Sequence, residues 1–254
     1  MRILLRIYAV LVLLFLLAPL IVVLPLSFSA SEMMSLPVRG LSWHWYHDFF
    51  TDSHWRMASA NSLAVGLATM VLATSIGTLA AIGIRFAGRK ARVILILLCL
   101  PIVVPSVIAG LAIYLVFARL GLVNTLAGLV LAHSVLALPY VVLTVHAVLR
   151  DFDAQLLRAA ASLGAKPGLT LWAVVLPLLA PAIGAGAVFA FTISFDELIV
   201  ALFIAGPEQF TLPRQMLASA RDALSPTLAV AAVLVSAASL LLLGFYAVLQ
   251  RDPK

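Results

Sequence analysis

Residues 150–177 read RDFDAQLLRAAASLGAKPGLTLWAVVLP, a polar interruption in the otherwise apolar second half of the chain. Asp151 or Asp153 can cap the start of a helix, and Gly164 can end one in the left-handed conformation that glycine favours. The interval holds a helix of about ten residues, or roughly 15 Å. Residues 165–168 then predict a turn, and a second helix follows through Leu176-Pro177.

The apolar residues of the first helix fall on one face: Leu156, Ala160 and Leu163, with Leu157 and Ala161 beside them. Such an amphipathic helix can rest on the surface of a bilayer. It can equally offer its face to another protein. Composition and periodicity do not distinguish these two interpretations.

The composition predicts an integral membrane protein. Of 254 residues, 64% are hydrophobic and only 10% are charged, whereas soluble domains are about half apolar and a quarter charged. The net charge is +6, and the basic residues lie between the apolar runs. This position favours a role in orienting the chain in a bilayer over nucleic-acid binding. Cys99 is the single cysteine, so neither an intramolecular disulfide nor a cysteine metal cluster can form.

Six apolar runs are long enough to cross a hydrocarbon layer of about 30 Å. We place them at residues 7–29, 59–84, 93–118, 125–148, 180–204 and 225–249. The first run is longer than a typical signal-peptide core, which favours an uncleaved span. The chain is therefore expected to be all-α, one transmembrane domain over residues 1–254, with a polar loop at 150–178 between spans four and five.

The arginines and lysines predict the orientation. With a cytoplasmic N-terminus, the inside segments hold 11 of the 16 basic residues and the outside segments hold 5. This bias follows the positive-inside rule. Both termini and the 150–178 loop are thus expected on the cytoplasmic side.

Within the bundle, small residues recur along the second span, among them Gly66, Ala73 and Gly77, and they permit close helix packing in lipid. Pro101 and Pro105 predict a kink in the third span. Outside the membrane, residues 43–50 are rich in tryptophan, tyrosine and phenylalanine, which predicts a short amphipathic helix at the bilayer surface. His44 and His47 lie in it without a clear third metal ligand.

The spacing in the 150–178 loop resembles the cytoplasmic EAA loop of bacterial ABC importer permeases. The matching positions are Ala159, Ala160, Gly164, Leu176 and Pro177. In that family the loop docks on a separate ATPase and transmits its closing motion. The family usually has glutamate at the first position, where this chain has Arg158, so any contact made by that glutamate is in doubt.

The resemblance extends from about residue 59 to 250. GLVNT at 121–125, LAHS at 131–134, LPY at 138–140, SFDE at 194–197 and SPT at 225–227 are similar to polyamine-type permeases. The second permease subunit of spermidine/putrescine importers is the most similar subfamily. The resemblance implies an inner-membrane permease without a cofactor of its own. Its implied partners are an ATPase dimer that binds ATP, a second permease, a periplasmic solute-binding protein and membrane lipid.

Two carboxylates, Asp196 and Glu197, lie well inside a predicted span. Intramembrane acids are costly and by default mark a pathway, a partner charge or a wet cavity. We expect either that they line a route for a cationic solute, or that they pair with Arg119 or Arg214 or bond to backbone at a helix break. For His133 and His146 a hydrogen-bonded packing role is favoured.

Other classes of membrane protein fit less well. A secondary transporter driven by an ion gradient is the alternative, but six spans with no convincing internal repeat do not favour it. The sequence has no H-E-x-x-H, G-x-S-x-G or G-x-x-x-x-G-K-[ST] motif, so no catalytic residue, metal site or phosphate loop is predicted. The sequence of this chain does not identify the solute.

Overall fold

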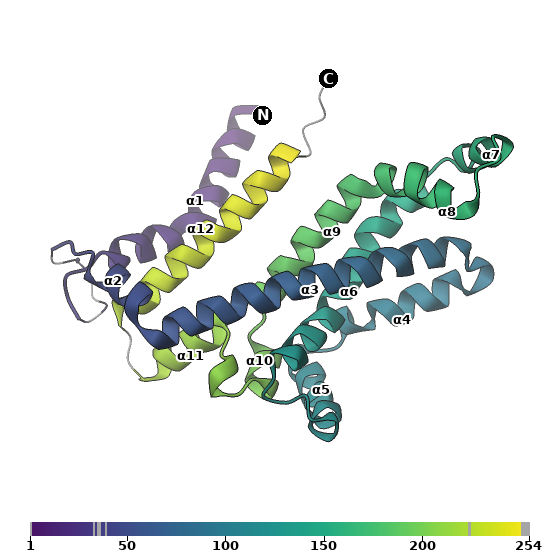
Figure 1. The fold of residues 1–254 in the computed structure, drawn as a ribbon. Helices are drawn as coiled ribbons and strands as arrows, with labels where there is room; N and C mark the ends of the chain where they lie inside the picture. Colours follow the sequence, from purple (N-terminus) through teal and green to yellow (C-terminus); the bar gives the residue numbers. More distant parts are fainter. Residues whose placement is uncertain (1, 33, 35–36, 39, 223–224, 250–254) are drawn as a thin grey trace. The chain divides into compact units, whose positions relative to one another are not determined.

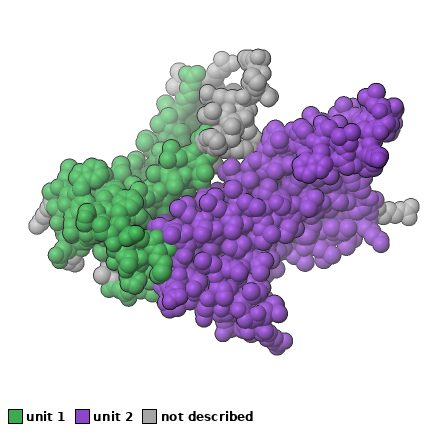
Figure 2. Space-filling view, in the orientation of Figure 1, with its two compact units in different colours: residues 1–58, 214–244 green, residues 59–213, 245–254 purple. Residues whose placement is uncertain are grey.

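The computed structural model describes residues 2–32, 34, 37–38, 40–222 and 225–249. Within them the chain is nearly all helical, and its only extended pairing is an isolated bridge between Ser29 and Leu41 (Figure 1). Internal contacts divide the chain into two compact units, residues 1–58 with 214–244 and residues 59–213 with 245–254 (Figure 2). The predicted all-helical class is confirmed.

The first unit holds α1 Arg2–Ser27, α2 His44–Thr51, most of α11 Leu212–Asp222 and most of α12 Pro226–Leu249. Polar contacts tie α2 to the end of α1. The Tyr46 hydroxyl lies 2.9 Å from Ser27 Oγ, and Trp45 Nε1 donates to the Ser29 carbonyl over 2.8 Å. The expected short aromatic helix is therefore present, and its rings hold it to the chain that leaves α1.

The second unit contains most of α3 Ser53–Phe86, then α4 Ala91–Val103, α5 Ser106–Leu120, α6 Leu126–Arg150, α7 Ala154–Ser162, α8 Pro167–Thr170, α9 Leu176–Asp196 and α10 Ile199–Ile204. In it, α6 and α9 lie side by side, α4 packs on α6, and α5 packs on α10 (Figure 1). The hydrophobic core runs between α3, α6 and α9.

Small residues on α3 set the distances in this core. A Cβ at Gly77 would lie 2.7 Å from Val141 of α6, and one at Gly66 would lie 2.9 Å from the Phe191 ring of α9. Ala73 is fully buried beside them. Both distances are shorter than side chains tolerate, so neither glycine can be replaced without displacing a neighbour. Such close packing is what drives helix association in lipid. The predicted role of the small residues is confirmed.

Among the described residues, four helices are long and apolar enough to cross a membrane: Leu4–Ser27, Ser53–Phe86, Leu126–Arg150 and Pro167–Asp196. A fifth crossing is possible if α4 and α5 form one bent span. The described apolar part of α12, Pro226–Leu242, is shorter. Six crossings therefore remain a prediction.

The predicted kink in the third span is a complete break. Val104 is extended, with φ −74° and ψ 127°, and the axes of α4 and α5 differ by 104°. The ring of Pro105 disfavours the helical conformation for the residue before it. The single continuous span expected at 93–118 is thus two helices that meet at Pro105.

The helix that carries the predicted fifth span, 180–204, has different bounds from that span. The long helix begins at Pro167 and ends at Asp196. Residues 198–205 are apolar, so hydropathy extends the span through them, but Glu197 is extended and separates α9 from α10. Asn124 N–H donates to the Ile204 carbonyl over 2.8 Å, which holds the end of α10 against the α5–α6 turn.

Candidate functional site

The polar interruption folds into two helical arms joined by a tight turn at the ends of α6 and α9 (Figure 1). The first arm is α7. Its cap is Asp153, whose Oδ1 accepts a hydrogen bond from Gln155 N over 2.8 Å. Because the first N–H groups of a helix lack partners within it, this carboxylate fixes where α7 begins. The start is one of the two that the sequence predicts.

The turn after α7 requires glycine. Gly164 has φ +79°; its N–H donates to the Ala161 carbonyl, and the next N–H, of Ala165, donates to the Ala160 carbonyl, each over 3.0 Å. These two bonds make a Schellman motif, which satisfies the last carbonyls of the helix. Glycine adopts this left-handed conformation without a steric cost, so the predicted helix end is confirmed.

The second arm begins with Pro167 at its first position, where the missing N–H costs nothing. Residues 171–175 form a π-helical turn, η2, in which Leu176 N–H donates to the Leu171 carbonyl. Pro177 follows at once, and its ring conflicts with the carbonyl four residues earlier. Helices often absorb such a disturbance in a π turn. Leu176-Pro177 therefore marks where the arm becomes the regular helix α9.

The six residues assigned to the ATPase-coupling loop divide between the arms: Arg158, Ala159 and Ala160 on α7, Gly164 at the turn, and Leu176 and Pro177 in the second arm. Arg158, Ala159 and Gly164 are exposed, whereas Ala160 is buried. The first four residues lie together at the outer end of the hairpin. The last two lie about three turns of helix further along, and they shape the arm rather than the outer end.

The helix α7 has an inward and an outward side. Leu157 packs against the core of α6 and α9, and Ala160 is buried. Leu156 and Leu163 are 42% and 88% exposed. The predicted apolar face is therefore divided, because the bundle covers the side centred on Leu157 and Ala160. The outward side carries Arg158 and the uncovered Leu163.

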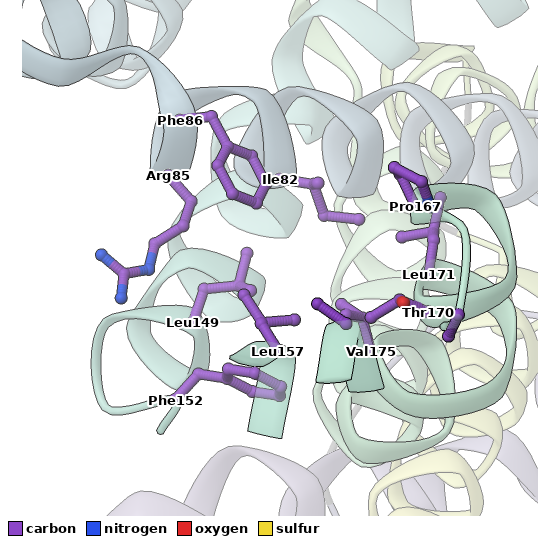
Figure 3. Close-up of a pocket in the computed structure, with 12 residues that line it drawn as sticks. Ile82, Arg85, Phe86, Leu149, Phe152, Leu157, Pro167, Thr170, Leu171 and Val175 are labelled. Carbon is purple, nitrogen blue, oxygen red and sulfur yellow. The ribbon is translucent and has the colours of Figure 1, made fainter. Parts of the chain in front are cut away.

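A cavity that sequence reasoning missed lies behind the inward side of α7 (Figure 3). Its volume is about 360 Å³. The walls are Phe86 of α3, Leu149 and Phe152 at the end of α6, Leu157 of α7, and Leu171 and Val175 of the second arm. Arg85, in the last turn of α3, is the charged residue of the lining. No local sequence signal joins these segments, because they meet only in the fold.

At the other end of α9 are the two predicted carboxylates. Asp196 is the last residue of the helix and is exposed. Glu197 is half-buried, and its Oε1 accepts a hydrogen bond from Val200 N over 2.9 Å. Of the roles considered, backbone bonding at a helix break is therefore realised by Glu197, which caps the first turn of α10.

The two histidines of α6 differ. His133 is fully buried, and its Nδ1 lies 2.9 Å from Ser194 Oγ of α9, so its hydrogen-bonded packing role is confirmed. The Nδ1 of His146 is buried and has no hydrogen-bond partner in the part of the chain that the structure describes. The hydrogen bond predicted for His146 is not present at that atom.

Taken together, these features define a polytopic helical membrane protein that presents a capped helical hairpin at one end of its bundle. Residues 73–254 match the family described as "Binding-protein-dependent transport system inner membrane component". The chain belongs to this family. It is the inner-membrane permease component of an ABC importer, and such a component is not itself the ATPase.

Three curated relatives are similar over most of the chain. The spermidine/putrescine transport system permease protein PotC of Haemophilus influenzae is 30% identical over 227 residues, covering 88% of this chain and 87% of that protein. The putrescine transport system permease protein PotI of Escherichia coli K12 is 31% identical, covering 87% and 81%. The molybdenum transport system permease protein ModB of Mycobacterium bovis is 31% identical, covering 85% and 88%.

Two solved structures share the fold. One is a bacterial ABC transporter involved in the import of alginate, with a TM-score of 0.72 at 18% identity, covering 100% of this chain and 97% of that one. The other is a bacterial alginate ABC transporter with a periplasmic protein bound to an alginate pentasaccharide, with a TM-score of 0.76 at 13% identity, covering 98% and 93%. At these identities the likeness concerns the architecture alone.

Proposed function

We propose that this chain is one of two different permease subunits in an importer of polyamines or a related small cationic solute. PotC and PotI support a polyamine. ModB is equally identical, so identity alone does not choose the solute. The choice rests on Asp196 and Glu197 at the end of α9, because carboxylates there attract a cation and repel an anion.

The proposed topology has six spans and both termini in the cytoplasm. Its support is the distribution of basic residues, 11 inside and 5 outside. The α7 hairpin then lies in the cytoplasm, and Asp196 and Glu197 lie toward the outer side of the bilayer. A periplasmic solute-binding protein docks on the external segments of this permease and its partner.

The observation that carries the coupling role is the exposed hairpin, held by the Asp153 cap and the Gly164 turn. Its outward side, with Arg158, Ala159 and Leu163, docks on one subunit of an ATPase dimer. Rigid local structure suits this task, because a helix fixed at both ends transmits displacement rather than absorbing it. Arg158 pairs there with an acidic group of the ATPase, in place of the glutamate usual at this position.

The second arm gives this displacement a path. Pro167–Asp196 is one helix of 30 residues, or about 45 Å, and it links the hairpin directly to the carboxylates. When the ATPase subunits close on ATP, they move α7, and the movement reaches the solute path along α9. Hinged or sliding helices of this kind are an established class of conformational switch.

The test is affinity purification of the tagged chain from mildly solubilised membranes, with mass spectrometry of the proteins that co-purify. Gly164→Val forces a β-branched residue into a left-handed turn and should release the ATPase. Gly168→Ala is the matched control, since a Cβ there meets nothing within 4 Å. We expect an ATPase and a second permease with the wild type and the control, and loss of the ATPase with Gly164→Val.

Recovery of the chain alone, in a form that still transports when reconstituted, would contradict the proposal. A self-sufficient secondary transporter would then replace it.

A further inference from the structure

The cavity behind α7 is almost entirely apolar. Aromatic and aliphatic side chains from four segments form its walls, and the only hydroxyl of its lining, that of Thr170, donates to the Lys166 carbonyl over 3.3 Å. A volume of about 360 Å³ lies within the range of ligand clefts, about 300–1,000 Å³. Water has few polar partners in such a space, and an empty space forfeits dispersion contacts.

Arg85 places one positive charge at the edge of this cavity (Figure 3). It follows 28 residues of α3, Met57–Ile84, that carry no charge. They extend about 42 Å at the rise of an α-helix, more than the hydrocarbon thickness of about 30 Å. Arg85 is thus expected at headgroup level. Among the ion pairs of the described residues, none involves Arg85.

The surrounding segments share this positive charge. Residues 85–92 and 150–178 together carry seven basic side chains, Arg85, Arg89, Lys90, Arg92, Arg150, Arg158 and Lys166, and two acidic ones, Asp151 and Asp153. Basic pockets between membrane helices on the cytoplasmic side are suited to anionic lipid headgroups. An apolar cleft that opens beside an exposed cation therefore matches both the acyl chain and the headgroup of an anionic lipid.

We infer that the cavity binds an anionic phospholipid, with an acyl chain between the two arms of the hairpin and the phosphate beside Arg85. The inference rests on the proposed cytoplasmic position of the hairpin. The acyl chain of the lipid would then complete the packing of the inward side of α7, where Leu157 and Ala161 line the cavity. Lipid would thereby support the orientation in which the outward side meets the ATPase.

The experiment is native mass spectrometry of the purified importer complex after exchange into phosphatidylglycerol or phosphatidylcholine. The wild type should retain one phosphatidylglycerol and no phosphatidylcholine. Arg85→Gln should lower this occupancy about fivefold, the change expected for one basic residue at an anionic surface, while Arg85→Lys should keep most of it. Arg92→Gln removes an equal charge from an exposed residue outside the lining and should lower the occupancy by less than Arg85→Gln does.

A second pair of variants tests the apolar part. Ala161→Leu places a larger side chain in the cavity and should displace the acyl chain, whereas Ala180→Leu, at an exposed position of α9 outside the lining, should not. Equal retention of both lipids, or equal retention by Arg85→Gln and Arg92→Gln, would overturn the inference. So would a cross-link from position 157 to the second permease, which would identify a protein segment in the cavity.

The same spectra separate this inference from the proposed function. A wild-type complex that retains the ATPase but binds both lipids equally would reject the lipid site and leave the importer assignment intact. Selective phosphatidylglycerol binding by a chain that never recruits an ATPase would reject the importer assignment and retain the lipid site.

Discussion

The two ends of α9 are both irregular, but different chemistry holds each one. At its start, a π-helical turn and Pro177 join the helix to the hairpin; at its end, the Glu197 carboxylate bonds to Val200 N–H over 2.9 Å. The first device consists of backbone hydrogen bonds and a proline ring, whereas the second uses a side-chain oxygen as the acceptor. The proposed function places ATPase docking at the first end of the helix and the attraction of a cation at the second. Changes at the two ends should therefore produce separable defects.

The largest effect is expected at the carboxylate end. Asp196→Asn combined with Glu197→Gln removes two charged contacts of roughly 1.5–3 kcal/mol each, so uptake of labelled putrescine should fall about a hundredfold or more. ATPase co-purification should be unchanged, because the hairpin is untouched. Uptake in proteoliposomes with the complete importer measures the effect. Unchanged uptake would remove the carboxylates from the solute path.

Single variants at Glu197 separate its charge from its capping bond. Glutamine keeps an oxygen that can accept from Val200 N–H, and alanine does not. Glu197→Ala should lower the free energy of unfolding by about 1 kcal/mol through the lost cap, while Glu197→Gln should not. A reduced uptake with glutamine at unchanged thermal stability assigns the charge to transport. Wild-type uptake with glutamine and a defect with alanine alone would assign Glu197 a purely structural role.

The next effect concerns the other end of α9. Pro177→Ala restores an N–H that can donate to the Ala173 carbonyl, so the π turn can relax. The π turn holds one extra residue, and its loss would rotate the second arm by about 100°. Misplacement of the hairpin should then lower ATP hydrolysis stimulated by binding protein about tenfold, without changing solute affinity. Pro181→Ala, in the regular part of α9, is the control and should retain stimulation.

The smallest effect is expected at the cap of α7. Asp153→Ala removes the acceptor for Gln155 N–H and should destabilise α7 by about 1 kcal/mol. Faster amide exchange over residues 154–158 is the measurement. Asp151→Ala, which removes the same charge from the residue that follows α6, should leave the exchange unchanged. Equally accelerated exchange in both variants would show that the loss of the charge, and not of the capping hydrogen bond, destabilises α7.

Local chemistry explains what the sequence could predict. Asp153 and Gly164 act on the backbone within a few residues, so the bounds of α7 follow from a short pattern. Pro105 predicts a kink but not the complete break between α4 and α5, because other prolines of this chain lie inside continuous helices. The spacing of the hairpin residues likewise indicates the family from the sequence alone.

Other features depended on neighbours that are distant in sequence. The apolar run after Glu197 continues the hydropathy of α9, and only its carboxylate bond and the Asn124 contact at Ile204 end the helix there. The pattern places Leu156 on the apolar face and Leu157 beside it, but the packing against the core of α6 and α9 covers Leu157. The cavity beside Arg85 joins segments of four helical regions, which no single pattern links.

The central claim is that the outward side of α7 meets an ATPase and the inward side does not. Its most direct test is site-specific disulfide cross-linking in a Cys99→Ser background, with cysteine placed at position 163 or 157 and a panel of single cysteines on the ATPase. Leu163 is 88% exposed, and Leu157 packs on the core. We predict cross-links from position 163 that strengthen with ATP, and none from 157. Cross-links of equal yield from both positions, or from 157 alone, would contradict the account.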